Sequence, residues 1–297
     1  MKFFYLACWF LKAKWLKKKQ PIQSVVFISN HCNLRCKHCN VVNVSNPVSR
    51  TFEEIKEDLV YCYKQGSRFV DFEGGEPLLW KDREKELNDL IDFAKNTGFF
   101  STTVTTNAQL PFDHCKADSI WVSMDGLGQF HDIIRGNGSF EKLEENIKKS
   151  NHTSLNVNMV INIHNYVNVE DTIQYVQSSP HIKKIAFNFH TPYQGTEALF
   201  LPWEKRAETI DLIIRMKRKG YPIMNSISGL KMMKQNDFSK QCWVTNFILA
   251  DGTRLTECFG KSVGICDRCG LCMAGEMYSI FAFKPDTVLA GLKVRVS

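Results

Sequence analysis

Three cysteines lie close together near the start of the chain, in the segment 31–40. Cys32, Cys36 and Cys39 have the spacing C-x3-C-x2-C and directly follow a β-forming run at residues 24–29. A closed zinc site needs four protein ligands, whereas an iron–sulfur cube held by three thiolates keeps one iron open to another molecule. The spacing therefore favours a 4Fe-4S cluster with one open position, and a zinc-bound loop is the alternative.

Further short motifs follow the next three predicted strands in order. Residues 74–77 read Gly-Gly-Glu-Pro, residues 105–107 read Thr-Thr-Asn, and residues 123–126 read Ser-Met-Asp-Gly. With the cysteine spacing, these motifs resemble those of the radical S-adenosylmethionine (SAM) superfamily over roughly residues 24–190. The resemblance implies that the open iron binds SAM, and that one electron from the cluster cleaves SAM to methionine and a 5′-deoxyadenosyl radical. The protein would mainly exclude water and groups that quench the radical.

The resemblance also implies which residues near the cysteines contact SAM. The ring of His38 is expected near the adenine. The loop formed by Gly74, Gly75, Glu76 and Pro77 is expected to hold the methionine ammonium. Two glycines permit a close backbone approach, and a carboxylate suits a cationic amine.

The later motifs supply the other predicted SAM contacts. By the same resemblance, Asn107 and Ser123 are expected to contact the ribose and the methionine carboxylate, and Asp125 belongs to the same cofactor-binding segment. Arg135 lies in the segment 131–136, which resembles peptide-modifying and sulfatase-maturing members of the superfamily. It is expected either to pair with the SAM carboxylate or to anchor its own loop.

A second group of cysteines lies near the end of the chain, at Cys242, Cys258, Cys266, Cys269 and Cys272. This segment resembles the reduced, single-cluster (twitch-like) form of the SPASM extension, and also the ending of hopanoid-pathway radical SAM enzymes. The resemblance implies an auxiliary 4Fe-4S cluster, for which the first four cysteines are the predicted ligands and Cys272 is the spare. A structural zinc and unligated thiols are the alternatives. The isolated cysteines, expected to be small apolar fillers, are Cys8, Cys62 and Cys115.

β-type runs alternate with amphipathic helical runs from residue 24 onward. The predicted strands are 24–29, 69–73, 101–105, 120–124, 155–160 and 184–189, and the predicted helices are 52–64, 83–96, 139–149, 169–177 and 204–219. Six strand-then-helix units predict a parallel sheet, with function at the carboxyl ends of the strands. We expect an α/β fold, a partial (β/α)6 TIM-like barrel with a small C-terminal cysteine-rich extension. The predicted parts are 1–21, 22–235 and 236–297.

The charge of the chain is concentrated at its start. Six lysines and no acid lie in residues 1–20, which leaves a charge of +1 for the rest of a chain whose net charge is +7. A nearly neutral body argues against a nucleic-acid partner. Residues 2–19 predict an aromatic, lysine-tailed helix that either lies in a membrane interface or caps the barrel, and a signal peptide fits less well. The apolar runs are too short to span a bilayer.

The resemblance implies a radical SAM enzyme with a flavodoxin or ferredoxin-type electron donor. Two substrate classes compete. The lysine-tailed leader and the hopanoid-like ending favour a lipid or polyprenoid, whereas the SPASM-like tail favours a ribosomal peptide or protein, as in a peptide maturase. A non-catalytic metal-cluster protein is the alternative of another class, and the complete motifs argue against it. His190 and Tyr193 follow the sixth predicted strand and are expected to face the substrate chamber. We expect a cytoplasmic protein, with possible peripheral contact at the inner face of the membrane.

Overall fold

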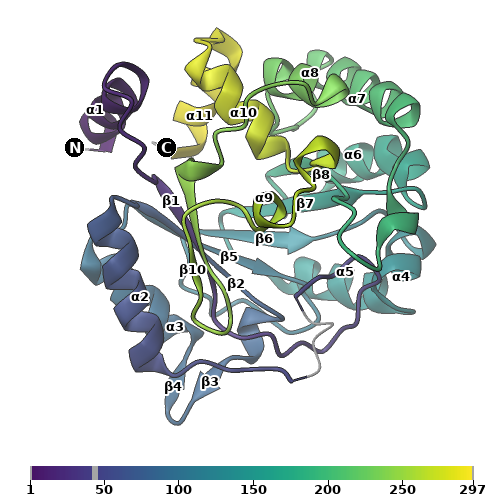
Figure 1. The fold of residues 1–297 in the computed structure, drawn as a ribbon. Coiled ribbons are helices and arrows are strands. Elements are labelled where there is room, and N and C mark those ends of the chain that lie inside the picture. Colours follow the sequence, from purple (N-terminus) through teal and green to yellow (C-terminus); the bar gives the residue numbers. More distant parts are fainter. Residues whose placement is uncertain (1, 42–45, 296–297) are drawn as a thin grey trace.

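The computed structural model describes residues 2–41 and 46–295. Its central sheet has eight strands in the order β10-β9-β1-β2-β5-β6-β7-β8 (Figure 1). All neighbouring strands are parallel except β9 and β10, and β10 and β8 form the two edges. The predicted α/β fold with a partial barrel is therefore confirmed. The strands are β1 (Gln23–Phe27), β2 (Phe69–Glu73), β5 (Ser101–Thr106), β6 (Ser119–Ser123), β7 (Leu155–Ile161), β8 (Lys184–Phe189), β9 (Thr245–Ile248) and β10 (Arg254–Leu255).

Most helices pack on the outer face of this sheet. The helices that follow the barrel strands are α2 (Phe52–Gln65), α3 (Leu87–Thr97), α4 (Gln129–Arg135), α5 (Ser139–Lys149), α6 (Val169–Ser178) and α7 (Trp203–Arg218). The remaining helices are α1 (Lys2–Trp15), α8 (Ile227–Gln235), α9 (Phe259–Ser262), α10 (Cys272–Phe281) and α11 (Pro285–Arg295). All six predicted strands are present to within two residues. The prediction of a helix after every strand is wrong once, because residues 107–118 join β5 to β6 without one.

Helix ends follow local sequence chemistry where the caps are strong. Thr51 and Glu54 form a reciprocal capping box at the start of α2, and Gly66 ends this helix with a φ of 112°. The helix predicted from residue 83 begins later, at Leu87. The preceding residues form a short hairpin of β3 (Lys81–Asp82) and β4 (Lys85–Glu86), which turns at Arg83 with a φ of 54°.

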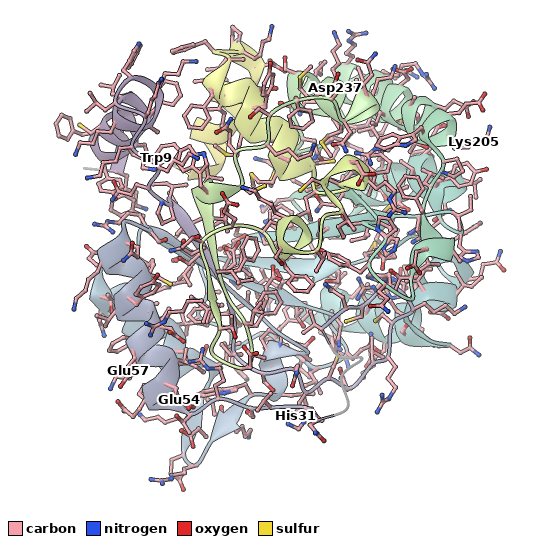
Figure 2. The ribbon with its side chains drawn as sticks, viewed as in Figure 1. Trp9, His31, Glu54, Glu57, Lys205 and Asp237 are labelled. Atoms are coloured by element: carbon pink, nitrogen blue, oxygen red, sulfur yellow. The ribbon has the colours of Figure 1, made fainter. Side chains whose placement is uncertain are left out.

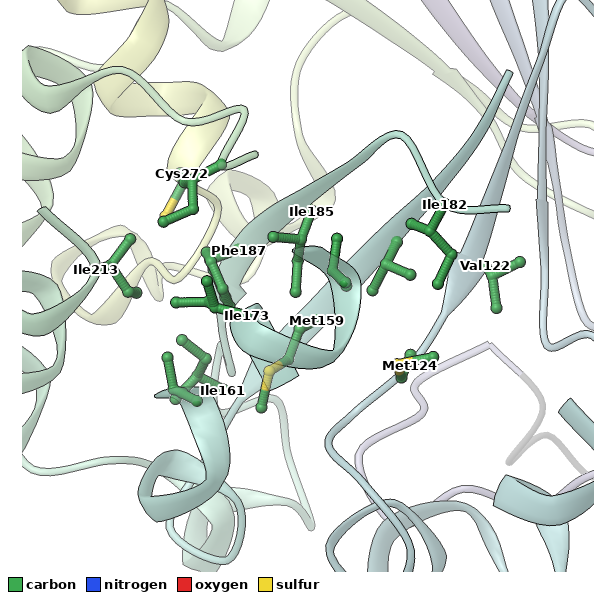
Figure 3. Packing of buried hydrophobic residues seen from close by; sticks show 14 of the residues in the cluster. Val122, Met124, Met159, Ile161, Ile173, Ile182, Ile185, Phe187, Ile213 and Cys272 are labelled. Atoms are coloured by element: carbon green, nitrogen blue, oxygen red, sulfur yellow. The ribbon is translucent and has the colours of Figure 1, made fainter. Parts of the chain in front are cut away.

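The two faces of the sheet have different chemistry. Residues on the outer face of each strand join apolar side chains of the covering helices in two core clusters, and Figure 3 shows one of them around Met159, Ile185 and Phe187. The alternate residues face the barrel interior, where polar side chains predominate, among them Asp71, Glu73, Thr103, Thr105, Asn156 and Asn158. An α/β barrel is normally filled with branched apolar side chains. This interior is instead polar and hollow.

The C-terminal region is joined to the barrel rather than separate from it. Strand β9 pairs in parallel with β1, and α10 packs on α8, where Ser226 N donates to Glu276 Oε1 at 2.8 Å. The first helix also docks here, since Trp9 lies against Trp243 and Phe281. It ends at Trp15, short of the predicted residue 19. The division at residues 21 and 235 stays a prediction. Across the described ranges, no helix is both long enough and apolar enough to cross a bilayer.

A buried ion pair connects α2 to the edge of the sheet and generates a stability prediction. Asp58 is 1% exposed, and it pairs with Arg50 and, at 2.7 Å, with Nε of Arg254 on β10. We expect Asp58→Ala to lower the free energy of unfolding by about 3–5 kcal/mol, because Arg50 would stay buried without its partner. Urea unfolding of the iron-free protein measures this loss.

Glu53→Ala is the matched control on the same helix. The side chain of Glu53 is 73% exposed in the pair with Lys56, so the loss should stay below about 1 kcal/mol. Equal losses for the two variants would contradict the assigned role of Asp58.

Candidate functional site

The first cysteine group lies in the loop that follows β1. Cys36 is buried, whereas Cys32 and Cys39 are partly exposed. Burial raises the pKa of Cys36 to about 11 against the lowering effect of the Arg135 cation, and Asp125, Cys39 and Cys32 add to the rise. In residues 2–41 and 46–295, no three His, Cys, Asp or Glu side chains converge on a single metal position.

The Gly-Gly-Glu-Pro loop packs directly beneath the cysteine loop. Gly75 N donates to Ser29 O and Glu76 N donates to His31 O, both at 2.8 Å. A Cβ on Gly74 would lie 2.2 Å from Ser29 O, and one on Gly75 would lie 2.0 Å from His31 O. The two glycines therefore permit a close backbone approach, and in this structure the backbone that approaches them is the cysteine loop. Pro77, which follows, is buried and starts a short 3-10 turn.

Glu76 connects this loop to the end of β5. Its carboxylate is 1% exposed and accepts hydrogen bonds from Thr106 Oγ1 and Asn107 N, both at 2.8 Å, and from Leu78 N at 3.2 Å. Burial raises the pKa of Glu76 to about 7, against these hydrogen bonds. The same strand end meets the cysteines, since Asn107 Nδ2 lies 3.5 Å from Cys32 Sγ. The predicted Glu76 and Asn107 therefore lie in one hydrogen-bonded network with Cys32.

A buried ion pair lies on the other side of the cysteines. Arg135 Nε donates to Asp125 Oδ2 at 2.7 Å, and Arg135 Nη1 lies 3.8 Å from Cys36 Sγ. Burial opposes ionisation of Asp125, but the charge of Arg135 holds the pKa of Asp125 below its usual value. Burial lowers the pKa of His38 to about 4, so the ring is neutral near pH 7. Arg135 thus both anchors its loop and places a cation beside a thiol.

Ser123, the remaining predicted SAM contact, is less closely connected to the network around the cysteines. It ends β6, is 9% exposed, and pairs in register with Asn158 on β7. His190 is buried and its Nε2 interacts with Thr196 O at 3.0 Å, while its ring meets that of His38 edge-on at 6.4 Å. The structure therefore brings the residues after β1, β2, β5 and β6 to one edge of the sheet.

The second cysteine group lies between the two edge strands of the barrel. Cys258 follows β10, while the segment ending at Cys272 runs along β8, where Cys272 N donates to Asn188 Oδ1 at 2.8 Å. Burial raises the pKa of Cys242 to about 12, and the nearby thiols of Cys258, Cys269 and Cys266 contribute. These four cysteines are therefore neighbours.

Cys272 has different surroundings from the other four. It is fully buried, and it belongs to the apolar cluster around Phe187 and Ile213 (Figure 3). Burial raises its pKa to about 12, and Cys269 is the cysteine that contributes to this shift. Cys272 therefore lies in the apolar cluster, and Cys269 is the thiol near it.

Arg206 beside the second cysteine group was missed by the sequence reasoning. It is 1% exposed on α7, lies over the rings of Phe189 and Trp203, and donates from Nη1 to Cys269 O at 2.9 Å. Nε and Nη2 have no partner within the described part of the chain. A buried cation without an acidic partner is costly, and it fits a site that carries negative charge. The sequence did contain an indication of its burial, because Arg206 lies on the same face of this helix as the apolar Ile210 and Ile213.

A cavity of about 1030 Å³ extends through the barrel interior. The strands line one side with polar residues, and α1, α10 and α11 line the other with Leu6, Phe10, Met277 and Ile280. Glu73, at the inner end, has its pKa raised to about 7 by burial and by Asp71. The cavity combines a polar wall with an apolar wall.

A parallel α/β barrel with three thiols after its first strand defines a class of iron–sulfur enzymes. A family model described as the radical SAM superfamily matches residues 26–179, just over half of the chain, and the chain belongs to this superfamily. The protein is therefore a radical SAM enzyme, and its cofactors are SAM and a 4Fe-4S cluster.

Curated relatives share moderate identity over part of their length. A probable GTP 3′,8-cyclase of Methanocella arvoryzae is 28% identical over 184 residues, which cover 57% of this chain and 58% of the relative. A GTP 3′,8-cyclase of Clostridium botulinum is 31% identical over 137 residues, 42% of each chain. The chain spans about half the length of these relatives.

Solved structures resemble almost the whole chain in fold. SuiB of Streptococcus suis bound to S-adenosylmethionine has a TM-score of 0.67 at 14% identity, covering 94% of this chain and 68% of that one. The enzyme anSMEcpe with bound AdoMet and a Cp18Cys peptide has a TM-score of 0.60 at 17% identity, covering 93% and 84%. At these identities the likeness is one of fold, and it extends beyond residues 26–179.

The contact between Gly75 and the cysteine loop generates a test of the site. We expect Gly75→Ala to lose about half of the bound iron and to lose SAM binding. The added Cβ would force His31 and the adjacent Cys32 to move. Iron content and SAM binding by calorimetry measure the effect. Circular dichroism checks that the variant folds. Full iron with normal SAM affinity would contradict the assigned contact.

Proposed function

We propose that Cys32, Cys36 and Cys39 hold the SAM-binding cluster of this enzyme. The observation that carries the proposal is the buried network in which Arg135 and Asn107 face two of these thiols. When bound, the cluster supplies the electron that cleaves SAM. An adjacent cation stabilises thiolates, so Arg135 would help to keep the cysteines in the form that binds iron.

We propose that the surrounding residues position SAM. Neutral His38 offers an aromatic face for the adenine without adding a charge, while Asn107 and Ser123 offer polar contacts to the ribose and the methionine carboxylate. Gly74 to Pro77 and Asp125 complete the proposed binding set. Glu76 accepts three hydrogen bonds within the protein. It therefore contributes to SAM binding by positioning the loop as much as by any direct contact with SAM.

We also propose an auxiliary 4Fe-4S cluster held by Cys242, Cys258, Cys266 and Cys269. The proximity of these four thiols supports the set. The unpartnered cation of Arg206 suits the net negative charge of a cube with four thiolates. A zinc ion with the same ligands is the competing proposal.

For the substrate we propose a lipid or polyprenoid. The apolar wall of the cavity and the exposed aromatic residues of α1 support this class. A peptide is the second candidate, because SuiB has been solved with its precursor peptide SuiA and anSMEcpe with peptides. A polar wall would suit a peptide backbone.

We further propose a cytoplasmic enzyme that receives electrons from a flavodoxin or ferredoxin. Reductive cleavage of SAM consumes one electron, so a one-electron donor is required. None of the eleven cysteines, all of which lie in the described ranges, forms a disulfide bond, and this supports a reducing compartment. The lysine-rich α1 supports peripheral contact with the inner face of the membrane.

The SAM-cleaving activity is testable without the substrate. Anaerobically reconstituted protein with dithionite and SAM should release 5′-deoxyadenosine, as measured by chromatography. Cys36→Ala should reduce this release at least 100-fold, because two thiolates would hold the cluster poorly. Release by the wild type no greater than that by Cys36→Ala would overturn the proposal.

The auxiliary cluster has a matched pair of variants. Combining Cys242→Ala with Cys258→Ala should remove about half of the iron per chain, whereas Cys272→Ala should retain it all, because Cys272 lies in the apolar cluster. Iron and zinc analysis with Mössbauer spectroscopy measures both. Unchanged iron in the double variant, or zinc in the wild type, would contradict the proposed cluster.

A further inference from the structure

Helix α1 has two apolar faces, and the body of the protein covers one of them. On the covered face, Tyr5 OH donates to Gly66 O and Trp9 Nε1 donates to Gln20 O, both at 2.7 Å. On the other face, Phe4, Leu11 and Trp15 follow helical spacing and are 74%, 47% and 61% exposed. A helix that only capped the barrel would need just its covered face.

The uncovered face continues onto the C-terminal helices. Trp15 lies 6.1 Å from the ring of Phe283, and Lys14 donates to Phe281 O at 2.6 Å. Helices α1 and α11 line the same cavity and lie on the same side of the molecule (Figure 1). We call the exposed residues here the amino-edge surface, namely Phe3, Phe4, Leu11, Trp15, Leu16, Phe283 and Leu289. Large exposed apolar patches mark interaction sites.

The charge around the amino-edge surface selects its partner. Six lysines and no acid lie in residues 1–20, and those from Lys12 to Lys19 are all exposed. Aromatic side chains among lysines match an interface with an apolar interior and anionic headgroups. Charge complementarity therefore points to an anionic bilayer.

The cavity opens at this same end. Phe3 of α1 and Phe283 line it and also belong to the amino-edge surface, and the exposed Lys183 next to the start of β8 lines it too. Its inner end reaches Glu73 and Asn188 at the carboxyl ends of the strands. Strands of five to seven residues make this path roughly 17–23 Å long.

The mouth and the first cysteine group lie on opposite sides of the protein. Figure 2 shows Trp9 of α1 and His31, next to Cys32, at opposite ends of the molecule. Docking at the amino edge would therefore leave the cysteine loop facing away from the bilayer.

We propose that the amino-edge surface docks on an anionic bilayer and that the apolar chain of a bilayer-borne substrate enters the barrel between α1 and α11. This proposal rests on the lipid class of the proposed function. The substrate would approach SAM from the amino edge of the strands, through the barrel. The apolar residues of α1 and α10 would contact its chain, and the polar strand wall would contact its polar groups.

Vesicle flotation tests the docking. Wild-type protein should float at least tenfold better with vesicles of 30% phosphatidylglycerol in phosphatidylcholine than with phosphatidylcholine alone, and 500 mM salt should abolish the difference. Flotation with the anionic vesicles should fall at least tenfold in the triple variant of Lys12→Glu, Lys18→Glu and Lys19→Glu. It should also fall at least tenfold when Phe4→Ser is combined with Trp15→Ser.

The control makes the same change of charge at the end of another helix. Arg215→Glu, Arg218→Glu and Lys219→Glu alter three exposed cations at the end of α7, and this variant should float like the wild type. No flotation by the wild type, or equal losses in both triple variants, would overturn the docking.

Blocking the mouth tests entry of the chain. Ala7 and Ala290 line the cavity at α1 and α11, whereas Ala282 is exposed and lies outside the lining. With cis-parinaric acid as a fluorescent probe, Ala7→Phe combined with Ala290→Phe should weaken binding at least tenfold, and Ala282→Phe should leave it unchanged. Iron content and circular dichroism check that each variant folds. No probe binding by the wild type, or no effect of the blocked mouth, would overturn entry from the amino edge.

Release of 5′-deoxyadenosine by the wild type separates this proposal from the proposed function. Release without flotation or probe binding would overturn the bilayer entry and leave the radical SAM activity in place. Flotation without release of 5′-deoxyadenosine would overturn the radical SAM activity and leave the bilayer docking in place, since vesicle binding requires no iron.

Discussion

The buried ion pair between Arg135 and Asp125 is the interaction on which the cofactor edge depends. It joins the end of β6 to the end of α4, and the same helix end accepts a backbone hydrogen bond from Lys37 N at Ile134 O, at 2.9 Å. The arginine also faces Cys36. Removing either partner would leave a charge stranded away from water, a large penalty for a protein of ordinary stability. One interaction therefore fixes the geometry of the cysteine loop and its electrostatics.

Each cysteine group has a buried arginine beside it, and the two arginines differ in how they are compensated. Arg135 has a carboxylate partner, so the first site is electrically balanced before any cluster is bound. Arg206 contacts a backbone carbonyl and two aromatic rings, and no ion pair involves it in the described part of the chain. The second site therefore depends more strongly on a bound anionic group to balance its charge. Arg206 is the residue whose surroundings change most when that group binds.

Periodicity and motif spacing predicted the barrel strands and the family, because both are written in local sequence. They did not predict the features that depend on contacts distant in sequence. The close approach of Ser29 and His31 to Gly74 and Gly75 is one of these features. The pairing of β9 with β1, the placement of Cys272 in the apolar core and the burial of Arg206 all require the folded chain. The hollow interior could have been inferred from the alternating polar residues of β5 and β7.

The gap between β10 and β8 determines how the barrel is closed. Among the described residues no strand pairing spans it, and the four neighbouring cysteines lie within it. If these thiols bind a cluster, the flank of the barrel is sealed by metal–sulfur bonds in place of a hydrogen-bonded ladder. Without that cluster the chain would keep its sheet but have an unsealed flank, and local opening of the barrel would cost least there.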